Sequence, residues 1–321
     1  MIRVVVGGTV RDKYVETSSE DPYLLGEKYE IDHALGEFYG GACANISATL
    51  SGLGARDTYV YTKLGDDAVG REALAYYEKM GINTSYIPTP SGESGESIIL
   101  LSTTSKQRMI FVRRVALGAD DIRPNLLEET GAQWVFMTSI GSAAQRMLDL
   151  VAEKPDVSVS VIFGHREIGM ISAGSLQIPA ALGDRPHAVL VLNLGEWNDL
   201  SAFHARLSAA FTEIVVTDGA NGMRLDCDVT GARVAGGVDE WLHVAACVPS
   251  GSIQDTSGAG DLSTAAYSYA RSLGADRLTS ARFAAVVAAM GICRIGAHTG
   301  AADAGVVPTL EALVKFVNEK Y

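Results

Sequence analysis

The sequence predicts an α/β protein in which a doubly wound, mostly parallel β-sheet is sandwiched by helices and carries a small antiparallel β-sheet beside it. Three observations lead to this fold class. Short apolar runs rich in β-branched and aromatic residues recur along the chain, segments with helical spacing lie between them, and two other segments alternate polar with apolar residues. Strands and helices that alternate at this rate are typical of a doubly wound sheet.

The apolar runs predict the strands of the main sheet. Their residues are apolar at consecutive positions, which is typical of parallel strands covered on both faces. The predicted strands are residues 4–6, 59–61, 134–137, 159–163, 189–192 and 214–216.

Helical spacing predicts helices over residues 46–53 and 69–80, and a glycine, Gly54 or Gly81, follows each of them. Glycine suits that place because the residue after a helix often adopts a left-handed conformation. The chain after Asp261 is mostly helical as well, and its predicted helices are residues 262–272, 277–294 and 310–318.

Residues 12–39 and 93–113 do not fit this repeat. Charged and aromatic residues nearly alternate in both segments, so each predicts a hairpin with one solvated face. We expect the two hairpins to form a small antiparallel sheet that projects from the main one. Because no internal repeat or low-complexity linker divides the chain, residues 1–321 are expected to form a single domain with this appendage.

The composition excludes several classes of protein. Of the 321 residues, 47% are hydrophobic and 20% are charged, as in globular proteins with a full core. The 26 Lys and Arg against 38 Asp and Glu, a net charge of −12, disfavour a nucleic-acid or anionic membrane partner. The sequence also predicts a soluble cytoplasmic protein. The four cysteines are widely spaced, charged residues come too early in the N-terminus for a signal peptide, and no apolar stretch reaches the ~20 residues that a bilayer requires.

Familiar motifs for phosphate binding and hydrolysis, such as GxxxxGK before Ser or Thr, GxGxxG, HExxH and GxSxG, do not occur in the sequence. An NAD-type dehydrogenase built on Gly7 and Gly8 is disfavoured for the same reason. What occurs is Asp-Thr-Ser-Gly-Ala-Gly-Asp at residues 255–261, directly before a predicted helix. Small residues at a helix N-terminus leave backbone N–H groups uncovered, and these can hold the charge of a phosphoryl group. The last residue, Asp261, can accept the proton of an attacking hydroxyl, or it can simply cap the helix.

Residues 255–261 resemble the second signature of the ribokinase family, the PfkB-type carbohydrate kinases. The resemblance extends over nearly the whole chain in the family's order. Its other parts are the Gly-Gly-Ala-Cys-Ala-Asn of residues 40–45 with Gly54 and residues 65–67, the Asn-Leu-Gly-Glu of residues 193–196, the strand-end loop of residues 216–222, and the helix and loop of residues 282–297. It implies a ribokinase-like fold and a kinase that transfers phosphate from ATP to a hydroxyl of a sugar or sugar-like molecule.

The resemblance also implies roles for particular residues at the site of transfer. Asp261 would be the general base, and the backbone N–H groups of Gly258, Ala259 and Gly260 would form an anion hole. An anion hole of this kind stabilises a transition state by about 2.7–4 kcal/mol per donor.

For the nucleotide, the resemblance implies contacts from Asn193, Thr217, Gly219, Gly222 and Ala285. Ala285 stands where ribokinase has an asparagine beside the adenine. Glycines in a strand-end loop also make tight turns, which is the alternative for Gly219 and Gly222.

Two metal sites are implied as well. Glu196 and Asn193 would act near Mg²⁺ through bound water, since Mg²⁺ keeps much of its hydration shell. Alternatively, Glu196 caps the helix that follows it. Asp255 and Ser257, with the loop of residues 296–300, would hold a monovalent cation such as K⁺.

On the acceptor side, the resemblance implies that Asp12 and Asn45 bind substrate hydroxyls. Gly40 and Gly41 would be the hinge of a lid formed by residues 12–39 and 93–113, and would let the backbone approach the substrate. Asp12 can equally be a solvated turn residue.

Three arginines lie in or beside the second lid segment. We expect Arg113 to contact the substrate, and Arg108 and Arg114 to be solvated. Residues 164–175 follow a strand end and match no part of the family pattern, and from there His165 and Arg166 could reach the acceptor.

Other functions remain open. A nucleoside kinase of the same fold is the first alternative, and aromatic residues of the first lid segment would suit it: Tyr14, Tyr23, Tyr29, Phe38 and Tyr39. A catalytically weak, ligand-sensing homologue is the second.

Because an exposed edge of a small sheet is often covered by a partner, a homodimer through the lid is expected.

Overall fold

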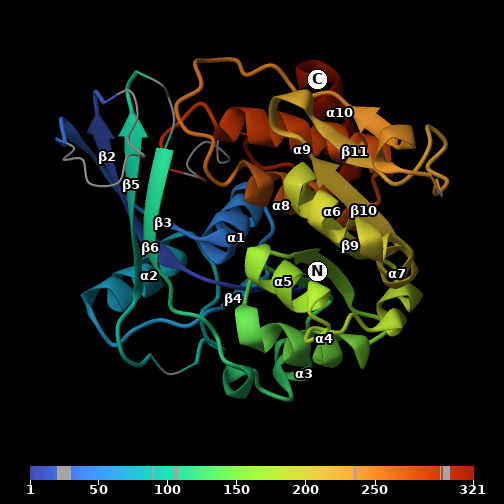
Figure 1. The fold of residues 1–321 in the computed structure, drawn as a ribbon, viewed down its shortest axis with the longest axis horizontal. Coiled ribbons are helices and arrows are strands. Elements are labelled where there is room, and N and C mark those ends of the chain that lie inside the picture. Colours follow the sequence, from blue (N-terminus) through green and yellow to red (C-terminus); the bar gives the residue numbers. More distant parts are fainter. Residues whose placement is uncertain (20–29, 89, 105–107, 235, 297, 299–303) are drawn as a thin grey trace.

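The computed structural model describes residues 1–19, 30–88, 90–104, 108–234, 236–296, 298 and 304–321. They form a large β-sheet with helices packed on both faces and a smaller sheet to one side (Figure 1). Within these ranges, no helix is both long enough and apolar enough to cross a bilayer.

The large sheet has the strand order β12-β11-β10-β9-β8-β7-β1-β4. The strands from β4 to β10 across this order pair in parallel, whereas β11 and β12 add an antiparallel edge. The bounds are β1 (Arg3–Val6), β4 (Thr58–Tyr61), β7 (Trp134–Met137), β8 (Ser158–Ile162), β9 (Ala188–Asn193), β10 (Glu213–Thr217), β11 (Met223–Leu225) and β12 (Leu242–Val244). The parallel strands are those that the apolar runs predict, so the predicted fold class is confirmed; the short strands β11 and β12 were not predicted.

Helices cover the large sheet in two layers. Consecutive residues of β1 show why, since Val4 and Val6 belong to one buried hydrophobic cluster and Val5 belongs to the other. The first cluster includes residues of α3 (Leu126–Thr130), α4 (Ala144–Ala152), α5 (His165–Ser172), α6 (Leu194–Leu200) and α7 (His204–Ala210). The second includes residues of α1 (Ala42–Gly52), α2 (Ala68–Lys79), α8 (Ala259–Ser272), α9 (Arg277–Gly291) and α10 (Leu310–Lys320).

The ends of the first two helices follow from local chemistry. The side chain of Asp67 caps α2, where its Oδ1 accepts a hydrogen bond of 2.8 Å from the Gly70 N–H. Gly54 and Gly81 follow α1 and α2 with φ of 99° and 68°, as predicted for residues that must turn out of a helix. Single 3₁₀ turns link other elements: Ala119–Asp121, Gly141–Ala143, Ala180–Asp184, Ser201–Phe203, Gly219–Asn221 and Val238–Glu240.

The small sheet has the order β3-β2-β5-β6. Its strands are β2 (Val10–Thr17), β3 (His33–Gly40), β5 (Gly95–Ser102) and β6 (Arg108–Arg113). The β2–β3 and β5–β6 pairs are the two predicted antiparallel hairpins, but the hairpins join through β2 and β5, which run parallel. Two of the aromatic residues singled out in the sequence, Tyr23 and Tyr29, lie outside the described residues.

Candidate active site

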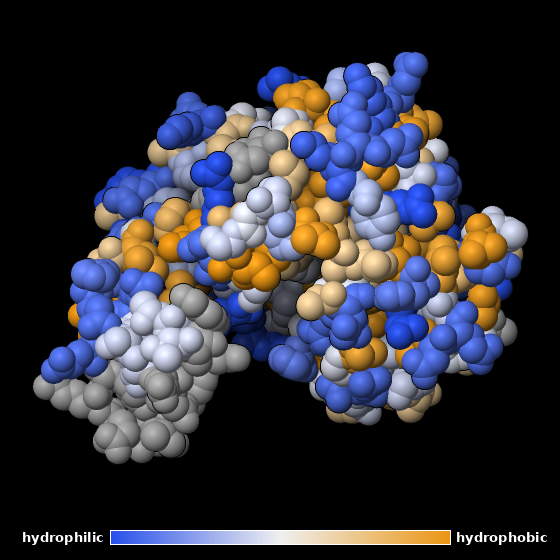
Figure 2. Space-filling view, turned by 90° about the horizontal axis from the view of Figure 1, so that it is seen from above, coloured by the Kyte–Doolittle hydropathy of each residue, from blue (hydrophilic) through white to orange (hydrophobic). Residues whose placement is uncertain are grey.

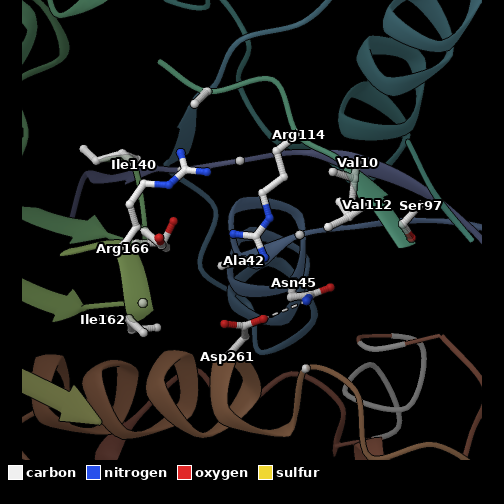
Figure 3. A pocket seen from close by; sticks show the side chains of 18 of the residues that line it. Val10, Ala42, Asn45, Ser97, Val112, Arg114, Ile140, Ile162, Arg166 and Asp261 are labelled. Carbon is white, nitrogen blue, oxygen red and sulfur yellow. Dashed lines mark hydrogen bonds between the residues drawn. The ribbon is translucent and has the colours of Figure 1, made fainter. Parts of the chain in front are cut away.

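A cavity of about 570 Å³ lies between the small sheet and the carboxyl ends of the parallel strands. It opens where strand order reverses, because the chain leaves β1 towards β4 on one side and runs from β7 to β8 on the other. Ligands of open α/β sheets bind outside such a reversal. Its walls include residues that directly follow β1, β7 and β8, and residues of the first turns of α1 and α8 (Figure 3). In the space-filling view of Figure 2, the molecule is visibly hollowed near the middle of the face shown.

Asp261 lies in the first turn of α8 and lines this cavity. The helix begins after Gly258, whose φ of 72° places the backbone in the left-handed region that glycine tolerates. The Asp261 Oδ2 accepts a hydrogen bond of 2.7 Å from the Asn45 Nδ2, which Figure 3 shows as a dashed line. Burial raises the pKa of Asp261 to about 6, and the nearby Glu196 carboxylate adds to this while the Asn45 hydrogen bond opposes it.

Asn45 therefore contacts the predicted base directly, a link that the sequence did not indicate. It lies in α1, 216 residues before Asp261, and it also lines the cavity. On its other side, the Asn45 Oδ1 lies 3.4 Å from Nδ1 of the buried His298, whose Nε2 contacts the Tyr76 hydroxyl. Burial lowers the pKa of His298 to about 4, so the imidazole is neutral near pH 7. Asp261, Asn45 and His298 thus form a continuous polar chain into the protein.

The predicted anion hole surrounds the start of α8. Of its three residues, Gly258 lines the cavity, and Ala259 and Gly260 do not. The Ala259 N–H points to the Thr256 carbonyl oxygen at a long 3.4 Å, and the N–H groups of Gly258 and Gly260 have no acceptor within the described ranges. A Cβ on Gly260 would meet nothing within 4 Å, so the space beside this backbone is open. Unpaired N–H groups next to open space are what an anion requires of a helix N-terminus.

Asp12 is buried in the cavity wall rather than solvated. The Ser97 hydroxyl donates a hydrogen bond to its Oδ1. Burial raises the pKa of Asp12 to about 6, the Ser97 hydrogen bond opposes this, and the Asp255 carboxylate adds to it. The alternative of a solvated turn residue is therefore wrong.

The glycine pair before α1 leaves room for this arrangement. A Cβ on Gly40 would stand 1.9 Å from the Asp12 Oδ2, and one on Gly41 would stand 2.5 Å from the Gly8 carbonyl oxygen. Gly41 lines the cavity with φ of 80°, whereas Gly40 does not line it. The glycines are required because the backbone approaches Asp12 and the turn after β1, a reason that the sequence did not indicate.

Asn193 and Glu196 form the helix cap that was the alternative to a metal site. The Glu196 N–H donates to the Asn193 Oδ1 at 2.9 Å, and the Asn193 N–H donates to the Glu196 Oε2 at 2.8 Å. Glu196 nevertheless lines the cavity, so its Oε1 remains available to the water shell of a magnesium ion. Burial raises the pKa of Glu196 above its ordinary value, and a nearby cation would reverse that shift. The donor set fits Mg²⁺ held through water.

The residues assigned to the nucleotide lie at the ends of the next strands. Thr217 ends β10 opposite Asn193 of β9, which brings these two side chains together at one sheet edge. Gly219 has φ of 52° and open space where a Cβ would be, as a bound phosphate would require. Gly222 is needed by the fold itself, since a Cβ there would stand 2.1 Å from the Val244 carbonyl oxygen. Ala285 belongs to α9 and is buried in the second hydrophobic cluster.

Asp255 and Ser257 form a buried polar pocket beside the anion hole. Asp255 accepts hydrogen bonds from the Ser257 N–H at 2.8 Å and from the Gly296 N–H at 3.3 Å. The Ser257 Oγ and the hydroxyl of the neighbouring Tyr14 are buried without a hydrogen-bond partner in the described part of the chain. A buried carboxylate with two unpaired hydroxyl oxygens is a donor set that fits a monovalent cation. Residues 297, 299 and 300 of the implied loop lie outside the described residues.

The three arginines of the second lid segment lie in different surroundings. Arg113 does not line the cavity; it forms ion pairs with Glu93 and with Glu96, the latter at 3.1 Å. Side chains alternate along β6 and Arg113 is on its outer face, so the geometry gives no support to the predicted contact of Arg113 with the substrate. Arg114 is exposed, as expected, but it also lines the cavity, and the Arg108 guanidinium contacts the Thr256 hydroxyl.

Residues 139–141 and 162–166 also line the cavity, and of these only His165 and Arg166 were predicted to reach the acceptor. They lie at or directly after the ends of β7 and β8. Because the strand ends of a parallel sheet share one edge, this position could have indicated that they line the site.

The comparisons with known proteins agree with this architecture. Residues 3–129 and 193–304 match the family described as pfkB family carbohydrate kinase. The ribokinase of Bacillus subtilis (strain 168) is 26% identical over 268 residues, which are 81% of this chain and 83% of that protein.

Solved structures share the fold at low identity. A Burkholderia thailandensis nucleoside kinase in complex with inosine has a TM-score of 0.75 at 14% identity, over 99% of this chain and 96% of that one. An Arabidopsis thaliana ribokinase complexed with ribose and ATP has a TM-score of 0.68 at 21% identity, over 98% of each chain.

Proposed function

The chain belongs to the pfkB family of carbohydrate kinases, and from this membership we propose that it transfers the γ-phosphoryl group of ATP to a hydroxyl of a sugar or sugar-like acceptor bound in the cavity. The observation that carries the proposal is the position of Asp261, a carboxylate at the cavity wall in the first turn of α8 beside unpaired backbone N–H groups. A relative complexed with ribose and ATP and another complexed with inosine support this choice of substrates.

Asp261 acts as the general base. Asn45 already donates to its Oδ2, so Oδ1 is the oxygen that takes the proton of the acceptor hydroxyl. The Asn45 amide also orients the carboxylate, which keeps the accepting oxygen directed at the cavity (Figure 3). A base whose pKa is about 6 is ionised at pH 7 yet remains basic enough to accept a proton as the oxygen attacks phosphorus.

The start of α8 stabilises the phosphoryl group during transfer. The N–H groups of Gly258, Ala259 and Gly260, together with the helix dipole, face the charge that develops on its oxygens. When bound with ATP, Mg²⁺ neutralises phosphate charge; Glu196 and Asn193 would hold it through water, and Thr217 and Gly219 would contact the nucleotide phosphates.

The small sheet acts as the lid of the cavity. Ser97, Ile110 and Val112 from its strands line the cavity opposite the large sheet. Closing this sheet over a bound acceptor excludes water, which favours transfer to the acceptor over hydrolysis of ATP. Asp12, held by Ser97, would bind an acceptor hydroxyl from this side.

A screen of acceptors tests the proposed function. Each pentose, hexose, sugar acid and nucleoside is incubated with ATP and Mg²⁺, and release of ADP is followed by a coupled assay. We expect ADP release that depends on the acceptor. Preference for nucleosides would establish the nucleoside kinase instead. If ligands raise the melting temperature but none supports ADP release, the protein is a ligand sensor and the proposal is wrong.

The lid is also proposed to join two copies of the chain. Ile98 and Phe111 are register partners on the face of the small sheet that is turned away from the cavity, and they are 48% and 59% exposed. Burying such a pair against its symmetry mate is favourable by about 1.5–3 kcal/mol per large side chain.

The four cysteines are free, which supports a reducing cytoplasm as the location.

We expect Phe111→Asp to convert a dimer into a monomer. The substitution removes two apolar contacts at a symmetric interface and brings two charges together, so the dimer should weaken by about 100-fold or more. Sedimentation velocity over a range of concentrations measures the change. Val229→Asp is the matched control, since Val229 is 80% exposed and lies outside the small sheet. A wild-type protein that is monomeric throughout would contradict the proposed dimer.

A further inference from the structure

Two arginines line the cavity and have no part in the proposed transfer. Arg114 directly follows β6 of the small sheet, and Arg166 is the second residue of α5, beside the large sheet. Figure 3 shows both side chains extending from opposite walls into the same space, with their guanidinium groups turned towards it. They thus bring two positive charges from two separate parts of the fold to one cavity.

Neither guanidinium is satisfied by the protein. No carboxylate of the described ranges lies within ion-pair distance of Arg114 or Arg166, and neither side chain makes a hydrogen bond there. The neighbouring Arg113 is different, since it is paired with two glutamates on the outer face of the sheet. Both side chains are exposed, so in the free protein water solvates two arginines without a protein counterion at one cavity, and a bound anion would replace that water.

The fold holds Arg166 in position. The buried Glu167 next to it accepts hydrogen bonds from the Gly164 N–H at 3.1 Å, from the Ser139 hydroxyl at 2.7 Å and from the Gly141 N–H. These contacts tie the start of α5 to the loop after β7. Gly141 has φ of 60°, and a Cβ there would lie only 3.2 Å from the Arg166 Nη1, so the arginine packs across it. A side chain supported in this way is pre-organised to bind.

The surroundings of the two arginines favour an anion. Ile110, Val112, Ile140 and Ile162 line the cavity near them, as the labelled residues of Figure 3 show in part. Apolar walls lower the local dielectric constant and strengthen a charge-assisted hydrogen bond. A guanidinium group binds carboxylates and phosphates through parallel N–H donors, so both anions match the pair.

We propose that the acceptor carries an anionic group, a carboxylate or a phosphate monoester, that Arg114 and Arg166 bind while its hydroxyl faces Asp261. This inference rests on the proposed kinase function and narrows its substrates to anionic sugar derivatives. An anion held by both arginines links the small sheet to the body of the protein, so binding of the correct acceptor also closes the lid. The γ-phosphate of ATP is the competing anion, but the unpaired N–H groups at the start of α8 already serve it in the proposed transfer.

The test uses matched acceptors that differ in charge. One pair is an aldohexose and its aldonic acid, and the other is a ketohexose and its 6-phosphate. kcat/KM is measured by ADP release for the wild type, Arg114→Gln and Arg166→Gln, with Arg113→Gln as the control from the same strand. Calorimetry of each acceptor in the absence of ATP gives a readout that does not depend on turnover.

We expect the wild type to prefer the charged member of at least one pair, and that pair identifies the anion as a carboxylate or a phosphate. Each cavity variant should lower kcat/KM and affinity for the charged acceptor by about 10–100-fold and leave the neutral one unchanged. Arg113→Gln should leave both unchanged. A wild type that prefers neutral acceptors overturns the inference, as do variants that raise KM for ATP with every acceptor.

The inference and the proposed function fail in different ways. ADP release with neutral sugars and no charge preference leaves a kinase without the anion site. Binding of the charged acceptor that is lost in Arg114→Gln, without any ADP release, supports the anion site and contradicts the kinase. If no charged acceptor binds by calorimetry, the anion site is wrong.

Discussion

Replacing Asp261 with asparagine is expected to lower kcat by about 10²–10⁴-fold, because the amide cannot accept the proton of the acceptor hydroxyl. The substitution keeps the size of the side chain, so α8 and its contact with Asn45 should remain. The measurement is kcat from ADP release with the best acceptor of the screen, together with the Kd for that acceptor. We expect kcat to fall while the Kd changes little.

The control addresses the possibility that Asp261 only caps its helix. Glu311 is an acid in the first turn of α10, is exposed and does not line the cavity. Glu311→Gln removes a charge from the same kind of position and should leave kcat unchanged. If Asp261→Asn behaves like Glu311→Gln, with a small loss of stability and full activity, Asp261 is a capping acid and not the base.

The pH dependence of kcat in the wild type is a second test of the role of Asp261. Because the base must be ionised and its pKa is about 6, kcat should fall as the pH drops through about 6. The Asn45 hydrogen bond favours the ionised form, so Asn45→Ala should raise the pKa of Asp261 and shift this acid limb to higher pH. A limb that stays in place in Asn45→Ala would show that another group controls it.

Replacing Glu213 with alanine is expected to lower the free energy of unfolding by about 3–5 kcal/mol, the typical cost of breaking a buried ion pair. Glu213 is buried at the start of β10 and accepts hydrogen bonds from the Tyr267 hydroxyl at 2.7 Å and from the Arg271 Nε at 3.0 Å. Its Oε1 lies 3.1 Å from the His187 Nδ1. Without the carboxylate, Arg271, whose side chain is 16% exposed, loses the acid with which it forms an ion pair at 3.0 Å. Urea unfolding followed by tryptophan fluorescence measures the loss.

A surface ion pair provides the comparison. Lys315 and Glu319 lie 4.0 Å apart, and both side chains are mostly exposed. Glu319→Ala should change the free energy of unfolding by less than about 1 kcal/mol, because solvent already screens the pair. Equal losses of unfolding free energy in Glu213→Ala and Glu319→Ala would mean that burial does not make the ion pairs of Glu213 more stabilising than a surface pair.

Glu213 and its partners His187 and Arg271 should also make the stability of the protein depend on pH. Burial opposes ionisation of Glu213, but the hydrogen bonds and charges of His187 and Arg271 outweigh it and lower the pKa of Glu213 to about 2. The folded protein therefore holds the carboxylate ionised where the unfolded chain binds a proton. This contribution to stability is complete above pH 4.5 and is lost as the pH falls towards 2. Glu213→Ala should show a weaker decline over that range than the wild type.

Much of the fold could be predicted because burial on both faces leaves a local pattern in the sequence. The runs that became β1, β7 and β9 are apolar at consecutive positions, since each successive side chain enters one or the other of two hydrophobic clusters. The short edge strands β11 and β12 were not predicted because three residues are too few to show such a pattern. The parallel pairing of β2 with β5 escaped prediction because it joins residues that are 85 positions apart, such as Val10 and Gly95.

The candidate site likewise has features that could be predicted from the sequence and features that could not. The string ending at Asp261 was visible because a helix start, small residues and a carboxylate are consecutive in the chain. The contact with Asn45 was not, since 216 residues separate the two and nothing local in either segment indicates the other. The choice between Arg113 and Arg114 also required the structure. Side chains alternate between the faces of a strand, so one residue of register decides which arginine enters the cavity.

By itself, the sequence determined the class of fold, the positions of the main strands and helices, and the chemistry at the start of α8, because each of these depends on neighbours in the chain. Only the tertiary structure decided what surrounds that chemistry: Asn45 on the carboxylate, Asp12 buried against Gly40, and Arg114 facing Arg166. These contacts depend on how distant segments meet in space, and the interaction of two side chains leaves no mark on the residues beside either of them.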